Sequence, residues 1–377
     1  MRRGTLLIHN GYEADPVTGA LGVPVVQTST FAQKDLAGRQ EFDYARSGNP
    51  TRKALEETIA ALEGGAKGYA FGSGIAAVSS ALGIFQAGDH IVAAEDIYGG
   101  SYRIFNTFYK RWGLEVTMTD SSDPENIRRA VRGNTKALFL ETPSNPLLKI
   151  CDLKTCIGVA KEAGLVTIVD NTFMTPLLQR PLELGADIVV HSATKFLGGH
   201  SDVVSGLAVT SSEELGRRVY AVQNSFGAVP GPWDVWLVLR GLKTLRVRME
   251  AQENSARKLS RALRGNKNVE AVYYPGLDDH PGKKIHDGQS SGAGAVFSFK
   301  TKTTEQALGF LSRVKYAAAA VSLGGVETIA SYPVKMSHAA VPPAERRRLG
   351  ISDTLIRISC GLEDCDDLVE DFENALK

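Results

Sequence analysis

Lys195 lies in the segment Ser192-Ala193-Thr194-Lys195-Phe196-Leu197-Gly198-Gly199, directly after the apolar run ADIVVH. A lysine between a buried strand and an apolar, glycine-rich segment is expected to be partly desolvated, which lowers the pKa of its amine and makes it a nucleophile. The hydroxyl groups of Ser192 and Thr194 could donate hydrogen bonds to a phosphate. An isolated lysine is usually a surface residue, so the interpretation depends on the residues that accompany it.

A glycine-rich turn, Gly72-Ser73-Gly74-Ile75, opens a helical run. Free backbone N–H groups and the positive end of a helix dipole make such a turn suitable for binding a phosphate. The same letters match G-x-G-x-x-A, a fingerprint of dinucleotide binding, which favours an NAD-binding oxidoreductase as an alternative. That fingerprint should close the first strand of its sheet, whereas about 70 residues precede it here. We therefore expect a phosphate site, with a purely structural turn as the other interpretation.

Asp170 ends the apolar run VTIV and precedes Lys195 by 25 positions. Alone, an aspartate at such a place is a helix cap or a turn former. Together, a nucleophilic lysine, a carboxylate that can protonate a pyridine nitrogen and a phosphate cradle are the parts that a pyridoxal phosphate enzyme needs. The carboxylate keeps the ring nitrogen cationic, and the cationic ring withdraws electrons from the α-carbon of a substrate.

The elements that must position these residues follow from the pattern between about 53 and 210, where amphipathic stretches alternate with short β-branched runs. This alternation is typical of crossover units on a mostly parallel sheet, and it predicts the α/β class. Ligands bind at the carboxyl ends of such strands. The runs end at Glu95-Asp96, Glu141-Thr142, Asp170-Asn171 and His191-Ser192.

The flanking regions predict an N-terminal arm and a second domain. Residues 1–52 form an irregular arm, because Gly48, Asn49 and Pro50 interrupt any helix there. Residues 53–230 form the cofactor domain and residues 231–377 a smaller α+β domain. In the latter we expect one long connecting helix over 236–263, strands at 295–300 and 355–362, and a closing helix at 368–376. The intervening stretch 317–343 is rich in small residues and turn formers. A loop of that length inside a compact domain more often has a function than serves only as a connection.

Composition excludes several classes. The 377 residues carry 43 Lys+Arg and 42 Asp+Glu, a net charge of +1, so no global field favours nucleic acid or an anionic membrane. No window approaches 18 apolar residues, so we expect no membrane span. The spacing of Cys151, Cys156, Cys360 and Cys365 fits neither a zinc site nor a disulfide framework. We expect reduced thiols, no metal and a cytoplasmic location.

With these residues in place, the chain resembles the Cys/Met-metabolism family of pyridoxal phosphate enzymes over essentially its whole length. The matching motifs follow in order: YARSGNPT, FGSGIAAVSSAL, EDIYGGSYRIF, ETPSNPLLKI, IVDNTFMTPLLQRPLELGADIVVHSATKFLGGHSD, VSLGGVET and LIRISCGLED. The resemblance implies pyridoxal 5'-phosphate (PLP) as cofactor. It also implies the aspartate-aminotransferase-like fold (fold type I), with a seven-stranded, mostly parallel sheet covered on both faces and a smaller α+β C-terminal domain.

The resemblance further implies roles for individual residues. Lys195 would be the Schiff-base lysine and the base that moves the α-proton, Asp170 would pair with the pyridine nitrogen, and Tyr98 would stack on the ring and assist proton handling. The phosphate would be held by the turn and by two hydroxyl residues, namely Ser73, Gly74, Ile75, Ser192 and Thr194. The family's substrate carboxylate clamp corresponds to Arg357, completed by Asn145 and Ser322.

The N-terminal arm has a role of its own in the family. The tyrosine and arginine that match Tyr44 and Arg46 reach the phosphate of a neighbouring subunit. The resemblance therefore implies a homo-oligomer, at least a dimer, and a tetramer built as a dimer of dimers is the expected assembly. The expected partner at the site is an amino-acid thioether, without nucleic acid or membrane.

Two positions bear on the reaction. Many γ-cleaving and γ-replacing members carry a glutamate where this chain has Val321, and methionine γ-lyases typically carry a cysteine where it has Gly100. An apolar residue at 321 weakens the γ interpretations. The resemblance is greatest to β-cleaving members of the bacillus type, which implies conversion of L-cystathionine to homocysteine, pyruvate and ammonia in methionine biosynthesis. A cystathionine or homocysteine γ-lyase is the alternative within the family, and a non-catalytic assembly protein is a more remote one outside it.

Overall fold

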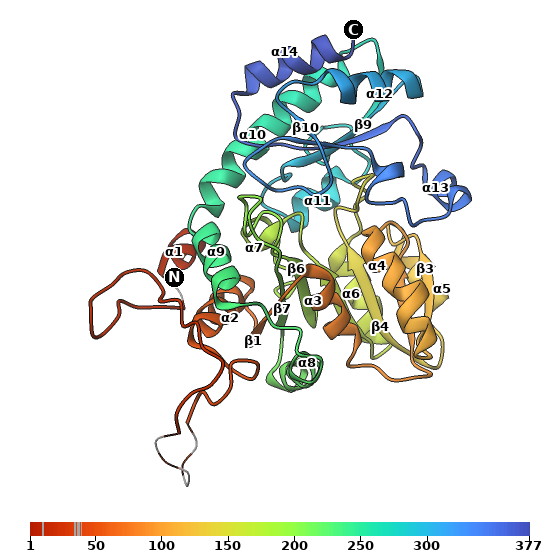
Figure 1. The fold of residues 1–377 in the computed structure, drawn as a ribbon. Coiled ribbons are helices and arrows are strands. Elements are labelled where there is room, and N and C mark those ends of the chain that lie inside the picture. Colours follow the sequence, from red (N-terminus) through yellow and green to blue (C-terminus); the bar gives the residue numbers. More distant parts are fainter. Residues whose placement is uncertain (10, 34, 36–37, 39) are drawn as a thin grey trace.

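The computed structural model describes residues 1–9, 11–33, 35, 38 and 40–377. It consists of a large and a small β-sheet region, and the described part of the N-terminal segment extends away from both (Figure 1). Five positions of the predicted arm, 10, 34, 36, 37 and 39, lie outside the described residues.

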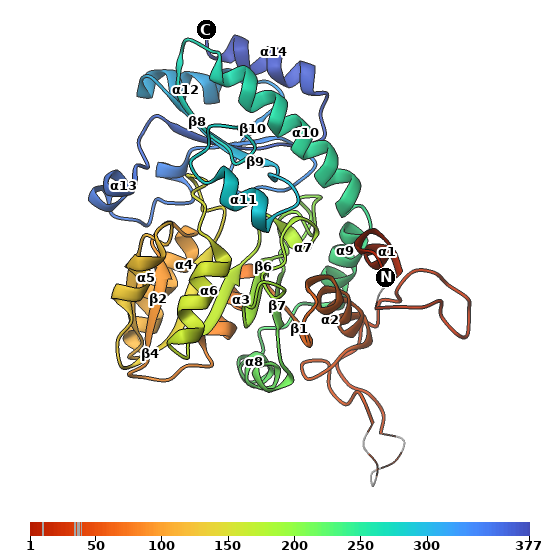
Figure 2. The same cartoon turned by 180° about the vertical axis from the view of Figure 1, so that it is seen from behind.

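The large sheet has seven strands. Six of them, β1 to β6, run in the same direction, while β7 runs antiparallel between β6 and β1. Helices cover both faces of this sheet, as the two opposite views show (Figures 1 and 2). The predicted α/β class and the seven-stranded sheet are therefore confirmed. In spatial order the strands are β1 (Lys67–Phe71), β7 (Gly206–Thr210), β6 (Ile188–Ser192), β5 (Val166–Asp170), β4 (Thr135–Glu141), β2 (His90–Ala94) and β3 (Glu115–Thr119).

The first long helix, α2, shows how local sequence sets the element boundaries. The Asn49 side chain accepts hydrogen bonds from the backbone N–H groups of Thr51 and Arg52, and Pro50 occupies the first helical position. Gly64 ends the helix with φ of 73°. The helices of the large-sheet region are α2 (Pro50–Glu63), α3 (Gly74–Leu82), α4 (Gly99–Ile104), the π-helix η1 (Phe105–Tyr109), α5 (Pro124–Ala130), α6 (Leu153–Glu162), α7 (Thr175–Leu178) and α8 (Glu213–Phe226).

The small sheet has five strands, and α10 and α12 pack against it, while α14 packs on these two helices. Its order is β10 (Ala318–Ala319), β11 (Ile329–Ser331), β12 (Leu355–Ser359), β9 (Val296–Thr301) and β8 (Val269–Tyr273). The helices of this part of the chain are α9 (Pro232–Leu242), α10 (Leu245–Arg264), α11 (Lys283–Gln289), α12 (Thr304–Arg313), the 3-10 helix η2 (Pro333–Lys335), α13 (Pro343–Leu349) and α14 (Cys365–Ala375). The expected smaller C-terminal sheet region is thus present.

The single long helix expected over 236–263 is wrong, because the chain breaks between α9 and α10. At the break, the buried Arg248 side chain donates hydrogen bonds to the carbonyl oxygens of Gly241 and Phe196, each over 2.8 Å. These contacts satisfy carbonyls at the end of α9 and tie the break to the turn that follows Lys195. Apolar residues continue at helical spacing across the break, so the periodicity did not reveal it.

The arm is also less irregular than predicted. Helix α1 (Arg3–His9) forms near the N-terminus, and its Leu7 is buried in the cluster that contains Leu55 and Ile59 of α2. This packing stabilises a helix that is too short to be stable alone. In the described part of the chain no helix is long and apolar enough to cross a membrane.

Candidate active site

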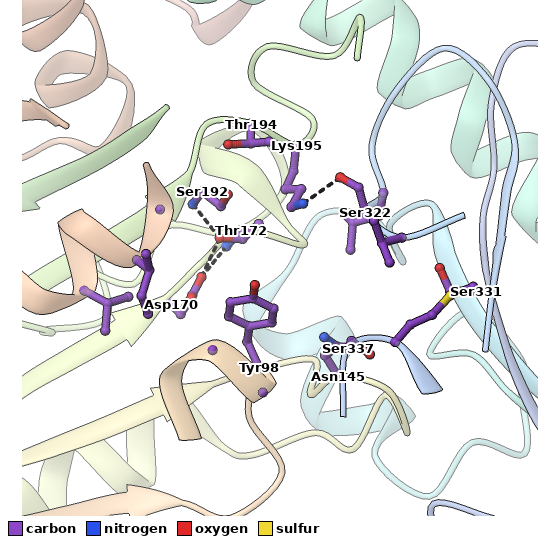
Figure 3. A pocket seen from close by; sticks show the side chains of 18 of the residues that line it. Tyr98, Asn145, Asp170, Thr172, Ser192, Thr194, Lys195, Ser322, Ser331 and Ser337 are labelled. Carbon is purple, nitrogen blue, oxygen red and sulfur yellow. Dashed lines mark hydrogen bonds between the residues drawn. The ribbon is translucent and has the colours of Figure 1, made fainter. Parts of the chain in front are cut away.

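A cavity of about 540 Å³ lies where the carboxyl ends of the large-sheet strands face residues of the small-sheet region. Its walls include the predicted residues Ser73, Gly74, Ile75, Tyr98, Asn145, Asp170, Ser192, Thr194, Lys195, Ser322 and Arg357. Residues that are far apart in the sequence therefore meet at one place, as Figure 3 shows for most of them.

The glycine-rich turn forms the N-terminus of α3. Ser73 caps this helix, since its Oγ accepts a hydrogen bond from the Ala76 N–H over 3.2 Å. A Cβ atom at Gly74 would lie 2.6 Å from the Cβ of Ser192, so only glycine lets the turn approach the end of β6 this closely. Backbone N–H groups of a helix's first turn have no partner within the helix, and here they lie beside a hydroxyl residue. This is the chemistry of a phosphate cradle.

The close approach of the glycine-rich turn to the sheet also requires a glycine in β7. Gly206 pairs in register with both Phe71 of β1 and Ser192 of β6. A Cβ atom at Gly206 would lie 2.1 Å from the carbonyl oxygen of Ser73. The absence of a side chain at 206 therefore allows the glycine-rich turn to close over the start of β7.

Asp170 ends β5 and is almost fully buried. Its Oδ1 accepts hydrogen bonds from the Thr172 N–H over 3.0 Å and from the Thr172 hydroxyl over 2.6 Å. Burial raises the pKa of Asp170, while the Thr172 hydrogen bonds and nearby His191 oppose that rise. A buried carboxylate with donors on one side only is suited to a cationic N–H on the other.

The Nζ atom of Lys195 lies in the same cavity and donates a hydrogen bond to Ser322 Oγ over 2.6 Å. Burial, and secondarily the charge of Arg357, lower the pKa of this amine to about 8. A lysine with such a pKa has a substantial neutral fraction near neutral pH, so it can attack an aldehyde.

Arg357 lies on β12 and is 3% exposed. Its guanidinium donates to Asn145 Oδ1 over 3.0 Å, to the Ser322 carbonyl oxygen over 2.6 Å and to Ser331 Oγ over 3.1 Å. Burial lowers its pKa to about 10, although nearby Glu141 raises it. All three partners are neutral, so the charge is positioned without being neutralised, as a carboxylate clamp requires.

Tyr98 stands immediately before α4, and its ring points into the cavity (Figure 3). The Tyr98 backbone N–H donates a hydrogen bond to Glu141 Oε2 over 2.8 Å. A Cβ atom at Gly100 would lie 2.3 Å from the Tyr98 ring, which explains why glycine suits this position. The hydrogen bond to Glu141 therefore fixes the backbone of Tyr98, from which the ring extends into the cavity.

Tyr44 and Arg46 are not brought to this cavity within one chain. The Arg46 guanidinium donates to the carbonyl oxygen of Asn224 over 2.6 Å and lies 5.5 Å from the centroid of the Tyr44 ring. Both side chains belong to the arm that extends from the molecule. Their predicted contact with a phosphate therefore stays a prediction.

Sequence reasoning gave no role to several residues that line the cavity, among them Thr172, Arg103 and Glu141. Glu141 ends β4, and Thr172 lies two positions after the end of β5. Their position at strand ends could have indicated a role in the site, but that position alone does not distinguish a functional side chain from a helix cap. Among the described residues there is no group of three or more side chains that could hold a metal ion.

The chain is similar to known proteins over nearly its whole length. The sequence profile of the family described as Cys/Met metabolism PLP-dependent enzyme matches residues 4–377. A cystathionine beta-lyase of Bacillus subtilis (strain 168) is 53% identical over 373 residues, covering 99% of this chain and 96% of that protein. A cystathionine gamma-lyase of the same organism is 49% identical over 377 residues, covering all of both chains.

A solved structure also matches the chain over its whole length. The crystal structure of a cystathionine gamma-lyase from Lactobacillus plantarum complexed with L-serine matches with a TM-score of 0.97 and 42% identity, covering 100% of this chain and 98% of that one. The chain therefore belongs to the PLP-dependent enzymes of Cys/Met metabolism, with their fold type I architecture. Its cofactor is PLP, and the dinucleotide interpretation of the glycine-rich turn is set aside.

Proposed function

We propose that this protein is a carbon–sulfur lyase that converts L-cystathionine to homocysteine, pyruvate and ammonia. The observation that carries the proposal is the placement of Lys195 Nζ in one cavity with Asp170 and Arg357, next to a phosphate cradle. Relatives named cystathionine beta-lyase at 53%, 48% and 46% identity support β-cleavage.

PLP supplies an electron sink that acidifies the α-carbon of a bound amino acid. Lys195 would bind the aldehyde of the cofactor, and once the substrate amine has displaced it, its freed Nζ would take the α-proton. Asp170 would hold the proton on the ring nitrogen, and the Gly74 and Ile75 N–H groups with the Ser192 and Thr194 hydroxyls would bind the phosphate.

The remaining residues orient the substrate. Arg357 would bind the α-carboxylate, with Asn145 and Ser322 fixing the guanidinium, while Tyr98 would pack on the cofactor ring. When the Cβ–S bond breaks, its electrons leave with sulfur, which takes a proton to give the thiol of homocysteine. Water converts the remaining three-carbon fragment to pyruvate and ammonia.

We propose in addition that Tyr44 and Arg46 bind the cofactor phosphate of a neighbouring subunit. Neither side chain lines the cavity of its own chain, and Arg46 instead contacts the carbonyl oxygen of Asn224, which supports this role. The active assembly is then at least a dimer, and a tetramer of two such dimers is the proposed state. Residues 1–52, 53–230 and 231–377 remain the proposed arm, cofactor domain and C-terminal domain, and the placement of the two sheets within the last two ranges supports this division.

A cytoplasmic location and a place in methionine biosynthesis complete the proposal. The four cysteines are all free thiols, which supports a reducing compartment. Homocysteine, the proposed product, is a thiol that a methyl transfer would convert to a thioether.

A γ-lyase is the second candidate, favoured by the relative named cystathionine gamma-lyase at 49% identity. Val321, which lines the cavity and is 65% exposed, supports the β-lyase instead, because many γ-cleaving and γ-replacing members of the family carry a glutamate at this position. The test is to identify the 2-oxo acid released from L-cystathionine by the purified holoenzyme. Pyruvate supports β-cleavage, 2-oxobutyrate contradicts it, and a colourless protein that takes up no PLP contradicts the whole assignment.

A further inference from the structure

Three buried acidic side chains lie side by side at the carboxyl edge of the large sheet. Asp170 ends β5, Glu141 ends the adjacent β4, and Asp96 follows β2, the next strand along. They are 9%, 7% and 4% exposed. Glu141 and Asp170 are direct register partners across the parallel pair, so their side chains start from neighbouring backbone positions.

Their hydrogen bonds differ in kind. Asp170 accepts two hydrogen bonds from Thr172, and Asp96 accepts one from the Ser144 hydroxyl. From the residues that the structure describes, the Glu141 carboxyl accepts a single hydrogen bond, which the Tyr98 N–H donates to Oε2. Within the described part of the chain, none of the three forms an ion pair with a lysine or arginine.

The neighbouring cations are engaged elsewhere. Arg357 donates to Asn145, Ser322 and Ser331, and Lys195 donates to Ser322. On the remaining sides, Lys149 pairs with Glu95 and Asp120, and His191 contacts Glu63. Glu141 thus faces the charged or titratable groups of Asp170, Asp96 and Arg357, of which only Arg357 is a cation, and the backbone N–H of Tyr98.

Two adjacent carboxyl groups in a buried site cannot both be ionised at low cost, so one of them binds a proton. Burial and the neighbouring Asp170 raise the pKa of Glu141 well above its usual value. Asp170 has two local donors, and a pyridine N–H of the cofactor would add a third interaction. Glu141 has a single donor, so it is the better place for the proton.

We propose that Glu141 is a neutral carboxylic acid in the working enzyme, which fixes the Tyr98 backbone and leaves Asp170 as the negatively charged partner of the cofactor's ring nitrogen. Glu141 is in this sense a positioning residue that acts through Tyr98 and Asp170. The inference rests on the proposed roles of those two residues. An ionised Glu141 would compete with Asp170 as the counter-charge of the cationic ring.

The first test is infrared spectroscopy of the holoenzyme, which detects the carbonyl stretch of a protonated carboxyl group. We expect at pH 7 a band that shifts when glutamate is labelled with ¹³C and that disappears in Glu141→Gln. Absence of such a band in a folded, yellow wild-type enzyme overturns the proposal. The band reports on Glu141 whether or not pyruvate is released, so it fails independently of the proposed β-lyase activity.

The second test uses matched variants. Glu141→Gln keeps a neutral acceptor for the Tyr98 N–H, whereas Glu141→Leu removes it. We expect the pH midpoint of the visible absorbance of bound PLP to stay within about 0.3 units in Glu141→Gln, and kcat/KM to be about tenfold lower in Glu141→Leu than in Glu141→Gln. A midpoint that falls by about one unit or more in Glu141→Gln would show that a negative charge had been removed, and would overturn the proposal.

A third variant tests the proposal without changing position 141, so its result does not depend on whether the Glu141 variants fold. Asp170→Asn removes the neighbouring charge while Glu141 stays in place. Because like charge is part of what retains the proton, the infrared band of Glu141 should titrate at a lower pH in this variant than in the wild type. An unchanged titration would contradict the pairing of the two carboxyl groups.

Discussion

The Nζ atom of Lys195 donates a hydrogen bond to the Oγ atom of Ser322, which lies in the small-sheet region, over 2.6 Å. The carbonyl oxygen of the same serine accepts a hydrogen bond from Arg357. Ser322 has φ of 86°, a left-handed conformation that costs a residue with a side chain about 1–3 kcal/mol. One strained serine thus holds the reactive amine and the proposed carboxylate clamp in a fixed relation.

Replacement of the lysine tests its central role. Lys195→Ala should lower kcat by at least ~10⁴-fold, because it removes both the attachment of the cofactor and the proton acceptor. Pyruvate release and the visible absorbance measure the two losses separately. Near wild-type turnover by this variant would exclude Lys195 as the catalytic lysine.

The lowered pKa of Lys195 predicts how PLP uptake depends on pH. The protonated amine cannot attack the aldehyde, and its pKa of about 8 lies below the usual value of 10.5. The rate at which the apoprotein takes up PLP should therefore rise between about pH 7 and 9 and then level off. Stopped-flow absorbance measures this rate, and a rise that continues to about pH 10 would contradict a desolvated lysine.

The guanidinium of Arg357 should contribute mainly to substrate binding. Arg357→Lys loses the planar fork and leaves Asn145 and Ser331 without their donor, so kcat/KM should fall about 100-fold, mostly through KM. The visible spectrum should change little. Arg348→Lys is the matched control, since Arg348 pairs with Glu95 and Glu345 away from the cavity. An equal loss in both variants would point to a general structural effect.

The role of the arm can be tested by mixing subunits. Arg46→Ala and Lys195→Ala are each expected to be nearly inactive alone. If the arm serves the neighbouring subunit, a mixed dimer contains one complete site, and random pairing should restore about a quarter of the wild-type activity. Native mass spectrometry verifies that mixed assemblies form. No recovery in verified mixed assemblies would place Arg46 with its own chain.

Val321 offers a test of reaction specificity. Val321→Glu introduces into the cavity wall the carboxylate that many γ-cleaving and γ-replacing members of the family carry at this position. The share of 2-oxobutyrate among the released 2-oxo acids should increase several-fold, whereas Val321→Gln, which has the same size without the charge, should keep the wild-type ratio. An equal change in both variants would assign the effect to side-chain size.

The strand ends explain why part of the site could be predicted from the sequence. Asp170 and Ser192 each end a β-branched run, and the fold brings such ends to one edge. Ser322 and Arg357 came only from the resemblance, because nothing local indicates that a loop and a strand of the small sheet will face that edge. Asn145 also came only from the resemblance, although it lies four positions after the end of β4. The antiparallel direction of β7 depends on its pairing with β1 and β6. The hydrophobic periodicity of the sequence does not indicate which strands pair or in which direction.

Other features were missed for the same reason. The break at Lys243-Thr244 is set by contacts of Arg248 with a distant turn, and α1 depends on burial against α2. The proton proposed on Glu141 arises from its register with Asp170, and the two lie 29 positions apart in the sequence. Tertiary contacts decided each of these cases, and local propensity did not.

Gly206 has no functional group and touches no proposed substrate atom, yet a methyl group there would overlap the Ser73 carbonyl. In a mutational scan scored by growth, every replacement at 206 should look as damaging as a replacement of the lysine. Sensitivity to replacement in such a scan would therefore mark two kinds of position. Some carry the side chains that perform the reaction, and others must lack a side chain so that those residues can be positioned.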